Sequence, residues 1–514
     1  MGLRVPDPAM SLTRRGLLTL AGAATVAGCG RLSDGPGTGR LLTSKVHPPR
    51  FVTPLPIPAT ARPVRVTADA DHYVLTQRVA DVNLLPDRKT RIWGYDGTFP
   101  GPTLRGRRGR PMVVTIRNEL PVPTSTHLHG GVTPPDSDGF PTDLTTPRGY
   151  SPAPPVQHGA PGQVHEISRD YHYPMAQRAA TLWYHDHRMD FTGPQVWRGL
   201  LGLCVITDPR EEALPLPRDE RDLPLVICDR AFDEDGSLQY PSQDMAMHAP
   251  GARGQFVTGV FGDVILVNGV AWPRHEVSGV RYRLRLVNAS NARRYRLALR
   301  AGGRRLPMIQ IGSDDGLLSA PITHTEIIVT PGERYDVVVD FAGLPIGTEA
   351  TLVNDFGTGG TTEVMRFAVV RQATDDSRVP DRLAAAEPPL TTADAVTERQ
   401  FDFRYDEGRW TVNRRLYDPA GSLAAPRLDT VELWRFTSDF HHPVHVHLAH
   451  FQVLSRAGRS PEPWETGWKD TVDVRPYETV EVLAKFAGHR GKYMLHCHNL
   501  EHEDMAMMAN FDVV

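Results

Sequence analysis

The alternation of apolar and polar residues along this chain is typical of short β-strands. Residues 112–118 and 281–287 follow a two-residue period, as a strand with one buried face does. Further strand-like runs follow at residues 335–341, 431–436, 445–454 and 479–486. Turn-forming clusters such as Gly97-Thr-Phe-Pro-Gly-Pro102 separate these runs, and helical periodicity is confined to short pieces. The pattern therefore predicts an all-β protein built from sandwiches.

Chain length and composition extend this prediction to several domains. With 514 residues the chain exceeds one ordinary hydrophobic core, which predicts about three domains. Its 45 glycines and 45 prolines suit many turns between short strands. The net charge of −3 gives no indication of a nucleic acid partner, so none is expected. Histidine is frequent, at 21 residues, and the histidines cluster.

A weak threefold repeat runs along the chain. A strand leads into His127-Leu-His129 in the first third, Asn288-Ala-Ser-Asn291 in the second, and His442-Pro-Val-His-Val-His447 in the last. Each third then closes on another strand pair, which ends in a histidine-rich segment in the outer thirds and in Leu352-Val-Asn-Asp355 in the middle one. Because the middle copy has asparagine and aspartate where the outer copies have histidine, it is predicted to be a structural spacer.

Charged, proline-containing runs at residues 209–222 and 372–398 mark the predicted domain boundaries. The expected organisation is an export signal at residues 1–29, a flexible linker at 30–60, a first domain at 61–210, a second at 222–372 without metal ligands, and a third at 398–514.

The N-terminus is predicted to be a targeting segment. Arg14-Arg15 precedes an apolar run too short to span a bilayer, a pattern that resembles a twin-arginine signal for export of folded proteins. Val26-Ala-Gly-Cys29 looks like a lipobox, in which Cys29 would be lipidated; the alternative is a chance cysteine after an ordinary cleavage site. We therefore expect a protein of the cell envelope, lipid-anchored at Cys29, or a secreted one.

Two other cysteines, Cys204 and Cys228, lie near a predicted domain junction. The favoured interpretation is two separate buried thiols, because free cysteine is among the most buried residue types. A disulfide between them is the alternative, which an oxidising compartment outside the cytoplasm would permit.

Four histidine-rich segments indicate a metal-binding protein. On a strand, residues i and i+2 face one side and residue i+1 faces the other, so each His-x-His pair presents two imidazoles together. In His496-Cys497-His498 the cysteine therefore points away from both histidines and can serve a different metal site. Several such segments in one chain, at His127-Leu-His129, His185-Asp-His187 and His445-Val-His447, leave chance a poor explanation.

Ligand chemistry selects copper. A cysteine, two histidines and a thioether are the ligands of a blue-copper site, here Cys497, His502, Met507 and, as the natural supplier of the second imidazole, His442. Eight histidines remain, which suit three copper ions, two with three histidines each and one with two. Structural zinc would need only four ligands in one closed site, so it does not account for the pattern.

The remaining histidines and methionines are interpreted as ordinary residues. Met505 and Met508 are expected to be packing residues beside Met507. Surface or hydrogen-bonded roles are expected for His158, His165, His172, His441, His450 and His489.

At these residues the sequence resembles the multicopper oxidase family, within it the group of bacterial spore-coat laccases and bilirubin oxidases. The resemblance covers roughly residues 60–514 and includes the middle-domain segments 285–292 and 312–318. The segments that carry it are His127-Leu-His-Gly-Gly-Val-Thr-Pro-Pro-Asp-Ser-Asp-Gly139, Leu182-Trp-Tyr-His-Asp-His187, His442-Pro-Val-His-Val-His447 and His496-Cys-His-Asn-Leu-Glu-His502-Glu-Asp504.

The resemblance implies three cupredoxin-like domains, each a Greek-key β-sandwich, and four copper ions. Asp138 and Glu503 match acidic residues that help to deliver protons to dioxygen; the alternative interpretations are a turn residue and a solvated glutamate. By motif the ligands would be His442, Cys497, His502 and Met507 for type 1 copper, His127 and His445 for type 2, and His129, His185, His187, His447, His496 and His498 for the type 3 pair.

The expected activity is that of a laccase. One-electron oxidation of a small reducing substrate, such as a phenol, an aromatic amine or a metal ion, would be coupled to four-electron reduction of dioxygen to water. Cys497 would connect the two sites through its bonded neighbours His496 and His498. The competing functions are a Cu(I) or other metal oxidase, for which Met245-Ala-Met247 is weak evidence, and a non-catalytic cupredoxin that transfers electrons or acts as a scaffold. We expect a monomer.

Overall fold

Strands dominate the protein, as the sequence pattern predicts. The computed structural model describes residues 35–150, 162–245, 247, 249–385 and 389–514; the predicted export signal with Arg14, Arg15 and Cys29, and also His158, lie outside the described residues. The α-helices there are short: α2 (Thr192–Arg198), α3 (Pro209–Ala213) and α4 (Leu500–Glu503). No helix in the described ranges combines the length and the apolar character needed to cross a bilayer.

Single 3-10 turns connect many of the strands. They are η1 (Pro135–Ser137), η2 (Asp219–Arg221), η3 (Gly254–Thr258), η4 (Gly359–Thr362), η5 (Thr392–Asp394) and η6 (Pro463–Glu465).

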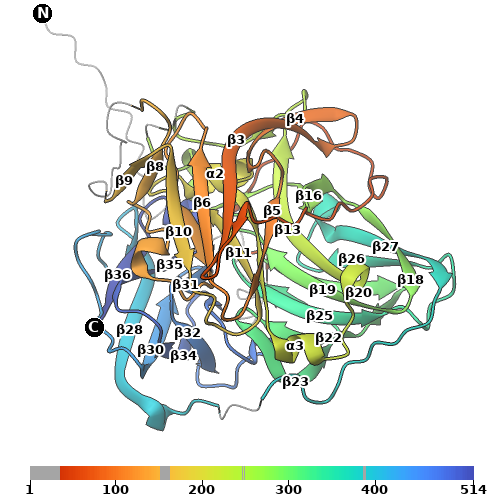
Figure 1. The fold of residues 1–514 in the computed structure, drawn as a ribbon. Helices are drawn as coiled ribbons and strands as arrows, with labels where there is room; N and C mark the ends of the chain where they lie inside the picture. The colour runs from red at the N-terminus through yellow and green to blue at the C-terminus, as the bar shows by residue number, and fades with distance from the viewer. Residues whose placement is uncertain (1–34, 151–161, 246, 248, 386–388) are drawn as a thin grey trace, which may run out of the picture.

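The first group of strands, orange to yellow in Figure 1, forms two packed sheets. One has the order β10-β6-β3-β2 with β4 beside β3, and comprises β2 (Arg65–Val66), β3 (Asp71–Leu85), β4 (Arg88–Tyr95), β6 (Met112–Asn118) and β10 (Ser168–Tyr173). The other has the order β5-β12-β11-β7 and comprises β5 (Gly101–Arg107), β7 (Thr126–His129), β11 (Ala180–Asp186) and β12 (Leu201–Thr207). A separate ribbon pairs β8 (Leu144–Thr146) with β9 (Val164–Glu166).

The second group, green to cyan, is the largest sandwich. Its first sheet comprises β13 (Asp222–Phe232), β14 (Leu238–Gln239), β16 (Val264–Val267), β17 (Val270–Ala271), β19 (Arg281–Asn288), β22 (Met308–Ser313), β23 (Gly316–His324) and β25 (Arg334–Asp340). Its second comprises β18 (Arg274–Gly279), β20 (Tyr295–Ala301), β21 (Arg304–Leu306), β24 (Ile327–Val329), β26 (Glu349–Asn354) and β27 (Glu363–Gln372).

The third group, blue, is again two sheets. One, with the order β29-β28-β30-β34-β32, comprises β28 (Ala395–Asp406), β29 (Arg409–Val412), β30 (Thr430–Ser438), β32 (His450–Arg456) and β34 (Thr479–Phe486). The other, with the order β33-β31-β35-β36, comprises β31 (His442–Val446), β33 (Thr471–Val474), β35 (Gly491–Cys497) and β36 (Met508–Val513). Cys497 and Met507 are part of the apolar core between these sheets.

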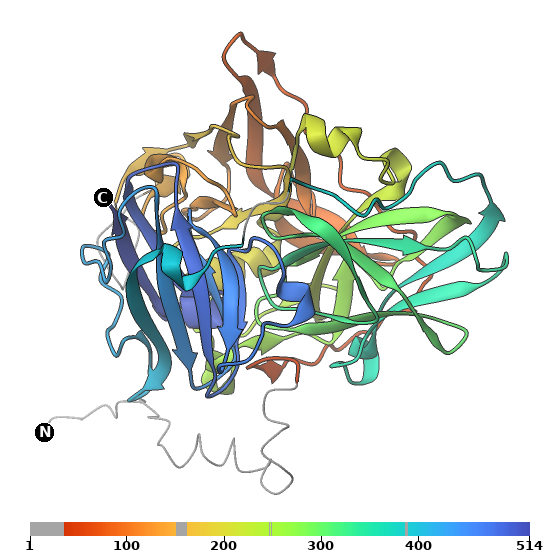
Figure 2. The same cartoon turned by 90° about the horizontal axis from the view of Figure 1, so that it is seen from below.

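The three groups surround a common centre. Figure 2, seen from below, shows the blue and green groups side by side with the orange and yellow strands above both. Thr181 of β11 donates to the Asp336 carboxylate of β25 at 2.8 Å, which joins the first group to the second. β11 is buried along its whole length because neighbouring groups cover it. Segments from different thirds of the chain can therefore meet in one buried site.

One predicted strand is in fact two. Residues 445–454 divide into the end of β31 and the start of β32, which belong to different sheets. Leu448, between them, adopts a left-handed backbone conformation with φ of 62°, which turns the chain from one sheet to the other. An alternation pattern continues across such a turn, so periodicity alone missed it.

The structure also differs from the linker predicted over residues 30–60, of which residues 35–60 are described. Strand β1 (Arg40–Leu41) pairs with β15 (Val260–Phe261), and the amide of Ser44 donates to Asp263 at 3.0 Å. Leu55 is buried in the main apolar core. The composition of this segment suggested flexibility, but the folded middle group supplies hydrogen-bond partners that composition cannot reveal.

Candidate metal centres

The Cys497 thiol lies against two imidazoles inside the third group of strands. Its Sγ is 3.3 Å from His442 Nδ1 and 3.5 Å from His502 Nδ1, and these two nitrogens are 3.2 Å apart. His442 begins β31, Cys497 ends β35 and His502 lies on α4, so adjacent elements of one fold bring the three together. We call His442, Cys497, His502 and Met507 the Cys497 site.

Hydrogen bonds on the far side of each ring determine which nitrogen faces the thiol. His502 Nε2 is 3.1 Å from the carbonyl oxygen of Thr258, and because a carbonyl only accepts, this nitrogen carries the proton. His442 Nε2 likewise faces the Asp439 carboxylate at 3.2 Å. Two Nδ1 lone pairs therefore point at each other beside a sulfur atom, an arrangement that a bound cation would stabilise.

Packing holds the rest of the site in place. The Trp410 ring stacks on His502 with centroids 3.7 Å apart, and the amide of Asn499 donates to Cys497 Sγ at 3.4 Å. The amide of Cys497 donates to the carbonyl of Met507 at 3.1 Å, so the methionine backbone is held next to the cysteine. Met507 is buried in the same core as Cys497, as the predicted thioether ligand should be.

Eight further histidines converge between the first and third groups. They are His127, His129, His185, His187, His445, His447, His496 and His498, all of them buried. Strand register brings them together: β7 pairs with β11 so that His127 lies opposite His185, and β31 pairs with β35 so that His445 lies opposite His496. We call these eight residues the histidine cluster.

The cluster joins the two groups directly. His127 Nε2 lies 3.4 Å from His445 Nε2, and His187 Nε2 lies 3.3 Å from His447 Nε2. Cys497 contacts the other site while His496 and His498 face the cluster, which confirms the predicted alternation of the triplet. Ligand atoms within 4.8 Å of one another define three all-histidine sets in the cluster: His127, His445 and His447; His129, His185 and His498; and His187, His447 and His496. A fourth group combines His129 and His445 with the Asp470 carboxylate.

The pKa values of several of these rings also suit metal binding. Burial, followed by the neighbouring histidines, lowers the pKa of His127 and His498 well below the usual value, and that of His185 to about 3. Burial also lowers the pKa of His187, but the nearby Glu503 outweighs it, so that pKa is raised. Neutral imidazole is the form that binds a metal.

The two acidic residues predicted from the sequence, Asp138 and Glu503, contact Nδ1 atoms of the cluster histidines. Asp138 Oδ2 is 2.8 Å from His447 Nδ1, and its backbone oxygen is 2.5 Å from His127 Nδ1. Glu503 places one oxygen 3.1 Å from His187 Nδ1 and the other 3.2 Å from His496 Nδ1. Burial raises the pKa of Asp138 to about 7. For Glu503, burial acts in the same direction, but His187 and His496 outweigh it and lower the pKa well below its usual value.

A third carboxylate was missed by the sequence analysis. Asp470, just before β33, has its Oδ1 3.0 Å from His129 Nε2, and its backbone oxygen is 3.0 Å from His445 Nδ1. No spacing marks it as a partner of these histidines. The relevant signal is the pairing of β33 with β31, which brings Thr471 opposite His445 and is visible only once the sheet is known.

The other assignments from the sequence agree with the structure. His441 and His450 are hydrogen-bonded, to Asp473 and Gly130 respectively, and contribute to none of the candidate metal groups among the described residues. Met508 packs in a small apolar cluster, and Met505 lies against the core of the third group. Cys204 and Cys228 are free, buried thiols, which confirms the favoured interpretation.

Comparison with known proteins agrees with this geometry. Family models described as multicopper oxidase match residues 78–211, 248–365 and 384–514. The chain is 36% identical to a laccase of Bacillus subtilis (strain 168), covering 90% of this chain and 98% of the relative. It is 35% identical to a bilirubin oxidase of Albifimbria verrucaria, covering 93% and 84%. The crystal structure of a laccase from Pediococcus acidilactici Pa5930 matches with a TM-score of 0.80 and 30% identity, covering 92% of this chain and 96% of that chain.

The chain belongs to the multicopper oxidase family. It is a laccase-like copper oxidoreductase, which oxidises reducing substrates with dioxygen as the acceptor. Its domains are cupredoxin-like, as the resemblance implied. These relatives do not favour a metal oxidase of copper tolerance or a non-catalytic scaffold.

Proposed function

We propose that the protein holds four copper ions, one at the Cys497 site and three in the histidine cluster. The type 1 ion would be held by His442, Cys497 and His502, and the Met507 thioether would be a further, weak ligand. Support comes from the two opposed Nδ1 lone pairs beside the sulfur, because a cysteine with two histidines is the trigonal donor set that copper prefers.

The cluster divides into one two-histidine site and two three-histidine sites. His127 and His445 both face each other through Nε2, since a backbone carbonyl occupies the Nδ1 side of each ring; they form the type 2 site. The type 3 ions would be held by two sets, His129 with His185 and His498, and His187 with His447 and His496. Nitrogens of His129, His185, His496 and His498 have no hydrogen-bond partner among the described residues, as expected for atoms that bind a metal.

Copper at these positions would supply one-electron redox chemistry between the reducing substrate and dioxygen. The chain contributes the connection: peptide bonds join Cys497 to His496 and His498, so a covalent path links the two sites. Glu503 and Asp138 orient cluster histidines through their Nδ1 atoms, and we assign to both carboxylates the delivery of protons toward dioxygen.

The reducing substrate would approach the edge of the Cys497 site. The His502 ring contacts the backbone of Thr258, at the end of the partly exposed turn η3, and stacks on Trp410. Such an apolar, aromatic surrounding suits phenols and aromatic amines better than hydrated metal ions. The Met245-x-Met247 pair does not offer a surface Cu(I) site, because Met247 is buried.

The N-terminal signal suggests where the protein works. Arg14-Arg15 and the lipobox ending at Cys29 support export by a twin-arginine route and lipid anchoring in the cell envelope, or secretion if Cys29 is not modified. Mass spectrometry of the N-terminal peptide from membrane fractions would test this: a diacylglyceryl group on Cys29 is expected, and an unmodified soluble form would contradict the anchor. We further propose a monomer without a nucleic acid partner.

The decisive experiment combines copper analysis with a substrate panel. Purified, copper-loaded protein should contain four copper ions per chain and consume oxygen with 2,6-dimethoxyphenol and with aromatic amines. Equal or faster oxygen uptake with Cu(I) or Mn(II) would contradict the phenolic assignment. One copper ion per chain without oxygen uptake would contradict the cluster.

A further inference from the structure

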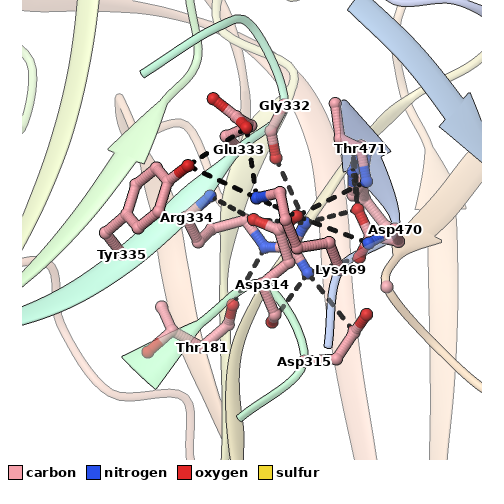
Figure 3. A network of polar contacts seen from close by, with 12 residues as sticks. Thr181, Asp314, Asp315, Gly332, Glu333, Arg334, Tyr335, Lys469, Asp470 and Thr471 are labelled. Atoms are coloured by element: carbon pink, nitrogen blue, oxygen red, sulfur yellow. Dashed lines mark hydrogen bonds and ion pairs between the residues drawn. The ribbon is translucent and has the colours of Figure 1, made fainter. Parts of the chain in front are cut away.

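The middle domain reaches the histidine cluster although none of its residues belongs to the candidate ligand sets among the described residues. Arg334, the first residue of β25, is completely buried. Its two terminal nitrogens donate to both carboxylate oxygens of Asp470, at 2.7 and 2.6 Å, as Figure 3 shows. The Arg334 guanidinium also donates to the carbonyl oxygens of Thr181, at 3.1 Å, and Asp314, at 3.0 Å. These bonds fix the orientation of the guanidinium plane.

Asp470 in turn contacts one histidine from each of the two domains that form the cluster. Its Oδ1 faces Nε2 of His129 at 3.0 Å and accepts from the Thr471 hydroxyl at 2.8 Å. Its backbone oxygen faces Nδ1 of His445 at 3.0 Å, and Oδ1 lies 3.4 Å from the same nitrogen. One residue thus accepts from ligands of two different metal sites.

Two glycines leave room for this arrangement. A Cβ on Gly130 would lie 2.4 Å from an Arg334 nitrogen and 2.7 Å from Asp470. A Cβ on Gly332 would lie 3.0 Å from the His129 ring and 3.2 Å from the His498 ring. The middle domain is therefore packed directly on the cluster histidines, which the interpretation as a spacer did not foresee.

A second buried ion pair holds the Asp470 segment against β25. Lys469 Nζ lies 2.9 Å from Asp314 and 3.1 Å from Glu333, and the amide of Arg334 donates to Asp314 at 2.7 Å (Figure 3). Consecutive residues of the third domain are thus paired with consecutive residues of the second. Because a buried charge is costly unless it is paired, the two domains must dock together for Asp470 to remain ionised at this position.

We propose that the Arg334–Asp470 pair is a positioning device: the Asp470 carboxylate selects which nitrogen of His129 faces the metal, and the Asp470 backbone oxygen, held in place by the same pair, does so for His445. A proton held between His129 Nε2 and the Asp470 carboxylate leaves Nδ1 as the ligand atom of His129. A proton held between His445 Nδ1 and the backbone oxygen of Asp470 leaves Nε2 as the ligand atom of His445. Arg334 fixes the plane of the carboxylate, because its two terminal nitrogens contact both carboxylate oxygens. This inference rests on the proposed function, since it requires copper in the histidine cluster.

The test compares Asp470→Asn and Arg334→Lys with the wild-type holoenzyme. The amide in D470N cannot accept from Arg334 on both of its terminal atoms, and the lysine in R334K cannot make the two-pronged contact. Partners behind metal-binding histidines typically contribute about tenfold to a hundredfold in metal affinity, so a loss in this range is expected for D470N and a smaller one for R334K. The measurements are copper retention against a chelator and the type 2 electron paramagnetic resonance signal. The blue absorption of the Cys497 site is expected to stay unchanged in both variants.

Glu465→Gln is the matched control. Glu465 also forms a buried, two-pronged pair with an arginine of the third domain, Arg456, but it contacts none of the cluster histidines in the structure. It should lose stability like the other two variants while keeping the type 2 signal.

The outcomes separate the proposed function from the positioning role of the Arg334–Asp470 pair. Wild-type protein without type 2 and type 3 copper would contradict the proposed function itself. If the wild type is fully loaded, an unaltered signal and unaltered chelator resistance in both D470N and R334K would overturn the positioning role. Equal copper loss in E465Q would also overturn it, because destabilisation would then explain the result.

Discussion

The Cys497 site and the histidine cluster contain the same kind of ligand but are assembled in different ways. All four residues of the Cys497 site come from one domain, within residues 442–507. The histidine cluster takes four residues from the first domain and four from the third, and the middle domain supports it through Arg334. The donors of the Cys497 site depend mainly on one domain's core, although the Thr258 carbonyl of the middle domain also contacts His502. The histidine cluster forms only when two domains dock, so the two sites should fail separately.

The largest expected effect comes from breaking the connection between the sites. Cys497→Ser removes the thiolate but leaves His496 and His498 on the cluster face of β35. Blue colour should disappear and turnover should fall to background, while copper in the histidine cluster remains, because the serine hydroxyl is a poor ligand for this site. Absorption spectra, oxygen uptake and copper content are measured together. Oxidase activity retained in this variant would contradict the electron path through Cys497.

The converse change should damage only the interdomain site. His447→Gln removes a ligand that belongs to two of the three cluster sets. Removing a residue that hydrogen-bonds to a metal-binding histidine already lowers metal affinity or activity by up to about a hundredfold. Loss of the histidine itself should therefore lower turnover by at least about a hundredfold. Blue absorption should persist and should bleach on addition of substrate without returning in air. Loss of the blue absorption as well would mean that the two sites are not independent.

A largely buried histidine outside the candidate metal groups, His450, should affect stability instead of copper content. Burial, followed by Arg178, lowers the pKa of His450 to about 4, below its unfolded value near 6.5. Because folding favours the neutral ring, its contribution is present above pH 6.5 and is lost as the pH falls through about 4.

His450→Gln should remove this pH dependence. Between pH of about 6.5 and about 4 the wild type should lose up to about 3 kcal/mol relative to the variant. The free energy of unfolding, measured by urea denaturation at several pH values, tests this, with copper content expected to be the same in both proteins. Parallel stability curves for the two proteins would refute it, and copper loss would place His450 among the ligands.

The smallest expected effect lies where the N-terminal segment meets the Cys497 site. The Thr38 hydroxyl accepts from the amide of His441 at 3.0 Å, and its carbonyl accepts from Asn499 at 3.0 Å. Thr38→Val removes the first bond and should lower the free energy of unfolding by about 1 kcal/mol. Thermal loss of the blue absorption reports it. Thr43→Val, at an exposed position in the same segment, is the control and should have no effect.

The predictions that succeeded are those that rest on short-range pattern. The alternation of residues 112–118 matches β6, and the opposite directions of Cys497 and its neighbours follow from strand geometry alone. The prediction of one strand over residues 445–454 was wrong at Leu448, where a single residue in the left-handed conformation redirects the chain without changing the alternation of apolar and polar residues. The linker predicted from composition failed because its partners, such as Asp263, lie far away in sequence.

The sequence by itself predicted the candidate donor set: ten histidines, one cysteine and one methionine, most of them at strand spacing, with the triplet that joins the two sites. Those features are local, since they depend on residue identity and on the two-residue period of a strand. Only the tertiary structure decided which imidazole nitrogens of the candidate sites are occupied by hydrogen-bond partners, and that the middle domain contacts the histidine cluster. Both depend on hydrogen bonds between residues far apart in sequence, such as Asp470 with His129 and with Arg334, which form only when three domains pack around one centre.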